Sequence, residues 1–220
     1  MSELRTDEEQ SEIVKKWWSE NALGLIATVV IASGSVFGWN YWQDQKRANA
    51  EAASATYSKL IELVAQEGTD KKSQLITLAE RLKNDYADTT YADFASLFIA
   101  RTAVDHGDFI AAESELKELI DSADSEPVKE LAKARLARVL IQMDRADDAL
   151  AVLPAEATPA FVLQIEEARG DALYRKGEFA EARLAYQRAV ESARGLGQSV
   201  ATLERKIDSL VVAASESEDA

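Results

Sequence analysis

Few side chains of this protein are of the types that perform chemistry. Cysteine is absent and His106 is the single histidine, which excludes disulfides, thiolate nucleophiles and thiolate metal sites. His106 directly precedes a turn glycine, and we expect it at an ordinary surface position at a helix end. Neither a nucleophile elbow nor a glycine-rich phosphate loop occurs. Acidic pairs such as Glu166-Glu167 and Asp147-Asp148 are adjacent along helices, so they point apart and cannot share a proton. We therefore predict no catalytic residue, no metal and no cofactor.

A binding surface is the better candidate for a functional site. Stacked helical hairpins form a concave face lined by the first helix of each hairpin, where such arrays hold peptides. In the register of a tetratricopeptide repeat (TPR), nine residues are predicted to face inward: Leu97, Arg101, Val104, Ala134, Arg138, Ile141, Glu167, Asp171 and Tyr174. This groove mixes apolar and charged side chains, and it lacks the paired Lys/Asn pattern that clamps a C-terminal carboxylate. With about three units, many of these side chains could instead simply pack against one another.

The hairpins that would position these residues are visible as a repeat. Three turns, at Gly107, Asp144 and Gly177, lie 37 and 33 residues apart, close to the 34-residue period of a two-helix repeat. A small residue stands seven positions before and five after each turn, and a larger apolar residue nine after: Ala100, Ala112 and Leu116; Ala137, Ala149 and Leu153; Gly170, Ala182 and Tyr186. We expect the small residues to bring the two helices of a hairpin close, and the larger ones to fill the gap to the next hairpin. In the middle copy Asp144 replaces the glycine, and Pro154 shortens the second helix.

Flanking helices complete the array. A helix over 73–86 is predicted to pack on the first hairpin, and one over 200–211, with its apolar residues on one face, to cover the last. We expect a TPR-like repeat domain over 44–212, beginning with a helical continuation of the preceding segment up to Gly68, and a disordered acidic tail over 213–220. The predicted fold class is all-α, since Ala, Leu, Glu, Lys and Arg dominate and only three prolines occur.

The N-terminal region contains a membrane anchor. After a short acidic tail, residues 1–20, the 23 residues of 21–43 lack any charge, enough to cross a hydrocarbon core of roughly 30 Å. Tryptophans lie before the span and Trp and Tyr residues at its end, as at membrane interfaces. A cleaved signal peptide would have a basic start and a shorter apolar region, so we predict an uncleaved anchor.

Two features of this anchor leave alternatives open. Basic residues tie on its two sides, and only the Lys15-Lys16 pair of the short tail favours a cytoplasmic N-terminus. Gly34 and Gly38 have the GxxxG spacing that lets two helices approach closely in lipid, although glycine is common in membrane helices anyway. Neither feature identifies a partner.

Net charge excludes further classes of function. With 39 acidic and 25 basic residues, the formal charge is -14. This charge repels nucleic acid and anionic lipid surfaces, so membrane attachment must come from insertion.

The chain resembles the YfgM family in several segments: the acidic leader, the span ending in FGWNYW, TYADFASLFIAR, RLARVLIQMDRADDAL, RGDALYRKGEFAEAR and RKIDSL. The resemblance implies a single-pass protein of the bacterial inner membrane with a cytoplasmic N-terminus and a periplasmic TPR-like domain. It also implies association with SecYEG and with a PpiD-type membrane-anchored chaperone, and a role in passing newly translocated, unfolded chains to periplasmic chaperones. It implies no catalytic residues.

Two functions follow as hypotheses. The first is a non-enzymatic scaffold at the Sec translocon that receives unfolded or nascent secretory polypeptides. The alternative is a membrane-tethered regulator that sequesters a signalling protein through the cytoplasmic tail, residues 1–16. An enzyme is the remote third hypothesis, because no catalytic motif is present.

Overall fold

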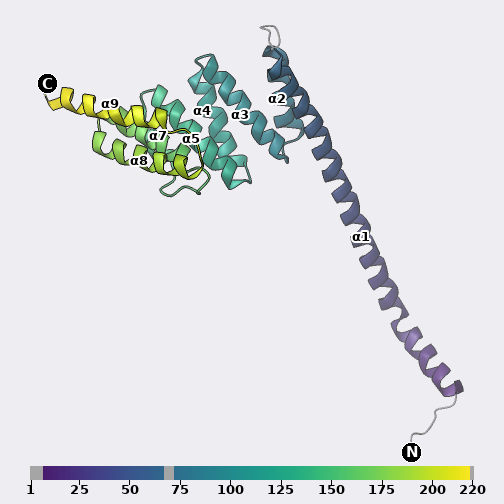
Figure 1. Ribbon diagram of the computed structural model, residues 1–220. Coiled ribbons are helices and arrows are strands. Elements are labelled where there is room, and N and C mark those ends of the chain that lie inside the picture. Colours follow the sequence, from purple (N-terminus) through teal and green to yellow (C-terminus); the bar gives the residue numbers. More distant parts are fainter. Residues whose placement is uncertain (1–6, 67–71, 219–220) are drawn as a thin grey trace, which may run out of the picture. The chain divides into compact units, whose positions relative to one another are not determined.

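The computed structural model describes residues 7–66 and 72–218, with side chains described over 11–66 and 73–210. The described residues form α-helices: α1 (Asp7–Ala65), α2 (Lys72–Asp85), α3 (Thr90–Asp105), α4 (Phe109–Ser122), α5 (Glu126–Gln142), α6 (Ala146–Val152), α7 (Val162–Lys176), α8 (Phe179–Gly195) and α9 (Ala201–Glu218) (Figure 1). This confirms the predicted all-α class. The break predicted at Gly68-Thr69-Asp70 lies outside the described residues.

The chain divides into two compact units, 1–52 and 53–220. Within the first, α1 contains a segment long and apolar enough to cross a membrane. Large apolar side chains along it are exposed, among them Ile31, at 69%, and Phe37, at 73%. A helix in the core of a soluble protein would bury such side chains against other helices, whereas a membrane-spanning helix exposes them to the lipid hydrocarbon.

In the second unit each helix packs against its successor, and α5 packs also against α7 (Figure 1). The three hairpins are α3–α4, α5–α6 and α7–α8, as the turn spacing predicts. The C-terminal part of α1 packs before the first hairpin, because its buried Ala53 and Leu60 form one hydrophobic cluster with Ala79 and Leu82 of α2. The predicted helix over 73–86 is therefore confirmed as α2, packed on α3.

One turn geometry recurs after α3, α5, α7 and α8. Gly107, Asp144, Gly177 and Gly197 each have positive φ, at 74°, 56°, 78° and 67°. At each turn this residue donates its N–H to the carbonyl three residues back, and the next residue donates to the carbonyl five residues before itself. These bonds define the Schellman motif, which ends a helix with a left-handed residue. The structure thus confirms that Asp144 takes the place of a turn glycine.

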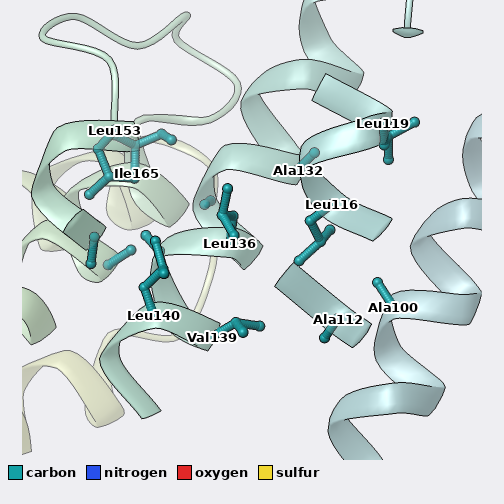
Figure 2. Close-up of a cluster of buried hydrophobic side chains, with 14 of the residues drawn as sticks. Ala100, Ala112, Leu116, Leu119, Ala132, Leu136, Val139, Leu140, Leu153 and Ile165 are labelled. Atoms are coloured by element: carbon teal, nitrogen blue, oxygen red, sulfur yellow. The ribbon is translucent and has the colours of Figure 1, made fainter. Parts of the chain in front are cut away.

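Small residues allow the helices of each hairpin to approach closely. Ala100, Ala112, Ala137, Ala149 and Ala182 are all at most 2% exposed. Figure 2 shows Ala112 and Leu116 of α4 lying between Ala100 of α3 and the side chains of α5.

The larger residue of the last repeat, Tyr186, makes a second contact besides the predicted one. An added Cβ at Gly170 would lie 2.4 Å from Tyr186 Cε1, so the ring lies over the partner helix of its own hairpin. The side chain is 3% exposed and contributes to the cluster that includes Leu203 and Leu210 of α9. Tyr186 therefore fills the space inside its own hairpin, where glycine leaves room for a ring, and also packs toward α9 as predicted.

The middle hairpin is completed by a loop rather than a full helix. As predicted from Pro154, α6 has only seven residues. Buried Glu130 of α5 accepts hydrogen bonds from the backbone N–H, at 2.9 Å, and the hydroxyl of Thr158. Arg169 of α7 donates to the Pro154 carbonyl. These bonds replace the missing turns of helix by fixing the loop at two points.

α9 covers the last hairpin, as predicted: it packs on α8 and buries Leu203 and Leu210. The helix is drawn through Glu218, and the disordered acidic tail over 213–220 stays a prediction.

Candidate functional site

A cavity of about 520 Å³ opens among the first helices of the hairpins. Its lining comes from α3, α4, α5 and α7: Ala100, Arg101, Val104, Phe109, Leu116, Arg135, Arg138, Val139, Ile141, Gln142 and Asp171. The stacking places α3, α5 and α7 side by side, because each hairpin presents its first helix to the same face. The second helix of the first hairpin, α4, contributes Phe109 and Leu116.

Five of the nine predicted groove residues line this cavity, namely Arg101, Val104, Arg138, Ile141 and Asp171. The structure brings them together from three helices that are far apart in sequence. Their function as a peptide site remains a prediction.

Four others lie elsewhere. Leu97 is 5% exposed and Ala134 is fully buried, so both belong to the hydrophobic core and not to the accessible surface. Glu167 lies next to the cavity and accepts a hydrogen bond from Arg138 at 2.9 Å. Tyr174 is 40% exposed and packs its ring against Phe179, with centroids 5.7 Å apart.

Sequence reasoning missed Arg135, Gln142 and Phe109. On α5 the face toward the cavity includes Arg135, Arg138 and Gln142, at helical spacings of three and four. The TPR register instead selected Ala134, one residue away and turned into the core. The polar residues Arg135, Arg138 and Gln142, at spacings of three and four within the more apolar second half of the helix, were the available signal.

The α7 side of the cavity holds a network of charged groups. Lys206 of α9 bonds to Glu167 at 2.9 Å and to Asp171 at 2.6 Å. Tyr186 donates its hydroxyl to Asp171 at 2.7 Å, and burial together with this carboxylate raises the pKa of Tyr186. The carboxylates on this side therefore already have cationic or hydroxyl partners.

The α3 and α5 side has cationic groups. Arg101 reaches Asp105 at only 3.8 Å, and both side chains are largely exposed, so the pair contributes little. Arg135 contacts the Leu97 carbonyl at a long 3.4 Å. Burial lowers the pKa of Arg135, and the neighbouring Arg101 and Arg138 lower it further. This part of the cavity can accept an anionic group.

His106 ends α3, where it is exposed and its Nδ1 lies close to the Thr102 carbonyl. Over the described part of the chain, no group of three or more His, Asp or Glu residues is arranged to hold a metal ion. In the anchor, a side chain added at Gly34 or Gly38 would meet no atom within 4 Å. A second helix could therefore approach this face, and the GxxxG contact stays a prediction.

An apolar N-terminal helix followed by stacked helical hairpins defines a membrane-anchored protein with a TPR-like repeat domain. The tetratricopeptide repeat-like domain family matches residues 15–212. No solved structure matches the chain.

Curated relatives place it more narrowly. An ancillary SecYEG translocon subunit of Haemophilus influenzae is 31% identical over 199 residues, which cover 90% of this chain and 96% of the relative. The proteins of the same name from Aggregatibacter actinomycetemcomitans and Escherichia coli are 34% and 30% identical, over 89% and 87% of this chain and 95% and 91% of those relatives. The chain belongs to this family of ancillary translocon subunits, which confirms the resemblance.

Proposed function

We propose that this protein is a non-enzymatic scaffold of the bacterial inner membrane that associates with the SecYEG translocon and helps to pass newly translocated proteins to periplasmic chaperones. The observation that supports this most is the near full-length match to ancillary translocon subunits, covering anchor and repeats together. In this proposal the N-terminus is cytoplasmic and the repeat domain is periplasmic. A PpiD-type membrane-anchored chaperone is the proposed downstream partner.

The topology is tested by cysteine labelling, since the chain has no cysteine of its own. Ser11→Cys reports on the N-terminal side of the apolar segment, and Ser209→Cys, exposed on α9, reports on the repeat domain. A maleimide that does not cross the inner membrane is added to intact spheroplasts. We expect labelling at position 209 alone. Labelling at position 11 alone would put the repeats in the cytoplasm and overturn the periplasmic role.

Receipt of translocating chains is tested by photo-crosslinking. A photoreactive amino acid at Gln142, which is exposed and lines the cavity, is expected to capture a secretory chain arrested during translocation. The same amino acid at Leu184, which is 55% exposed on α8 and outside the cavity lining, is the control. Equal capture at both positions would contradict a receiving groove.

The regulator hypothesis makes an opposite prediction about the N-terminal tail. Deleting residues 2–12 leaves the anchor and repeats intact, so translocon association should persist if the protein is a scaffold. If the deletion abolished the function of the protein in cells while translocon association was retained, the regulator hypothesis would be favoured.

The anchor itself offers a further interface. Replacing Gly34 and Gly38 by leucine would separate two helices that pack through the GxxxG face. We expect reduced crosslinking of the anchor to a membrane partner, or to a second copy, compared with a control in which Ala32 and Val36, four residues apart on the opposite face of the helix, are both replaced by leucine. Unchanged crosslinking would show that the glycines make no contact.

A further inference from the structure

The cavity contains one guanidinium without a carboxylate partner. Three arginines converge on it, Arg101 from α3 and Arg135 and Arg138 from α5. Arg138 is paired with Glu167 at 2.9 Å, and Arg101 lies 3.8 Å from Asp105. Among the side chains that the structure describes, Arg135 makes no ion pair, and its one hydrogen bond is the long contact with Leu97 O.

This arrangement is unusual in a chain with a formal charge of -14. Asp171, the one carboxylate that lines the cavity, is bound to Lys206 and to the Tyr186 hydroxyl. It is therefore not the missing partner of Arg135. An arginine presents five N–H donors in a planar fork that fits a carboxylate, and most of these donors are unused here.

Burial makes the unpaired charge of Arg135 more significant. Its side chain is half-buried, and its pKa is lowered by that burial and by the charges of Arg101 and Arg138. An anion placed between these three groups would offset both the desolvation and the mutual repulsion.

Apart from Gln142, the remaining residues that line the cavity are apolar. Val104, Phe109 and Leu116 line it together with Val139 and Ile141. If the anionic group belongs to an extended peptide, an apolar side chain from a neighbouring residue of that peptide would contact these apolar residues.

We infer that the cavity binds an acidic side chain of an extended, unfolded polypeptide at Arg135, with an adjacent apolar side chain in the hollow lined by Val104 and Phe109. This inference rests on the proposed function, because it defines the class of segment that the receiving groove takes. A side-chain carboxylate suits the geometry, since it can reach a half-buried guanidinium while the main chain crosses the mouth of the cavity. Acidic segments are repelled by the net negative charge elsewhere, which restricts them to this position.

The test uses the full-length chain in nanodiscs of phosphatidylcholine. The probe is a coumarin-labelled peptide, acetyl-Ser-Gly-Leu-Ser-Glu-Leu-Ser-Gly-Ser-amide, and binding is followed by fluorescence anisotropy. Its counterpart has Gln in place of Glu. We expect the Glu peptide to bind at least about 10-fold more tightly than the Gln peptide, because a hydrogen bond to a charged group contributes more than one to a neutral group. This comparison uses the wild-type protein only, and equal affinity for the two peptides would overturn the inference.

Arg135→Gln locates the site. It should reduce the affinity for the Glu peptide to that for the Gln peptide and leave the latter unchanged. The matched control is Arg183→Gln, an exposed arginine of α8 with the same loss of charge, which should preserve the difference. If Arg135 merely ties α5 to α3 through Leu97, its variant would lose stability while the preference for Glu persists, and the inference would fail.

A third peptide with Gln and a free C-terminal carboxylate separates the two sources of the anion. Tighter binding of this peptide than of the amidated Glu peptide would refute the assignment to an acidic side chain. Crosslinking of wild type and Arg135→Gln to SecYEG in native membranes is measured in parallel. Absence of that crosslink in the wild type would remove the proposed function while leaving the peptide result interpretable.

Discussion

The close contact between Gly170 and Tyr186 allows a direct test of how the two helices of a hairpin pack. A Cβ at position 170 would lie 2.4 Å, 2.5 Å and 2.9 Å from Tyr186 Cε1, Cδ1 and Cζ. Carbon atoms do not approach to such distances, so Gly170→Ala must displace the ring. The ring is held in place, because it is 3% exposed and its hydroxyl donates to Asp171 at 2.7 Å.

Opposing terms decide the size of the effect. Alanine is favoured over glycine within a helix by about 1 kcal/mol. Overpacking a tight core costs about 1–3 kcal/mol, and a displaced hydroxyl would lose a hydrogen bond with a net contribution of about 1 kcal/mol. We expect Gly170→Ala to lower the free energy of unfolding by about 1–3 kcal/mol in total.

The other two hairpins provide the compensating change. At the equivalent positions they have Ala100 with Leu116 and Ala137 with Leu153. Tyr186→Leu should therefore be tolerated better in the Gly170→Ala background than in the wild type, because the smaller side chain leaves room for the methyl group.

Urea unfolding of the four proteins, followed by circular dichroism at 222 nm in neutral micelles, gives the double-mutant cycle. We expect a coupling free energy of at least about 1 kcal/mol. The control is Gly195→Ala at the end of α8, where an added Cβ would meet no atom within 4 Å and the change should not destabilise. If Gly170→Ala stabilised the protein or the coupling were near zero, the ring would not be fixed as described.

Three further predictions concern the same domain and the same urea assay. Asp144→Gly should raise the free energy of unfolding by about 0.5–1 kcal/mol, because aspartate at φ 56° is strained and glycine is not; a loss of stability would contradict the turn. Glu130→Ala should cost about 1–3 kcal/mol, because its loop partners become unsatisfied, and hydrogen exchange should accelerate in the loop over 153–161; unchanged exchange would refute the clamp. Lys117, and then Arg145, lower the pKa of Glu113, so its stabilisation is present above pH 4.5 and is lost as the pH falls through the lower folded-state pKa. Glu113→Gln should therefore flatten the loss of stability below pH 4.5, and an unaltered acid profile would refute this role.

The sequence alone was sufficient for the architecture. The uncharged run of 21–43 and the recurrence of Gly107, Asp144 and Gly177 arise from local requirements. A bilayer needs a fixed length of apolar helix, and a left-handed turn needs glycine or a tolerated substitute. Such requirements act on short stretches, so they are legible without tertiary contacts.

Only the tertiary structure decided which side chains face the cavity. A rotation of α5 by one residue, about 100°, exchanges Ala134 for Arg135, and the rotation is set by packing against α3, α4 and α7. The pairing of Asp171 with Lys206 and Tyr186, which leaves Arg135 unpaired, also depends on residues from separate helices. Sequence periodicity locates the apolar face of a helix only to within about one residue. Which charged side chains of a site are paired depends on residues of other helices, and only the packing of those helices brings them together.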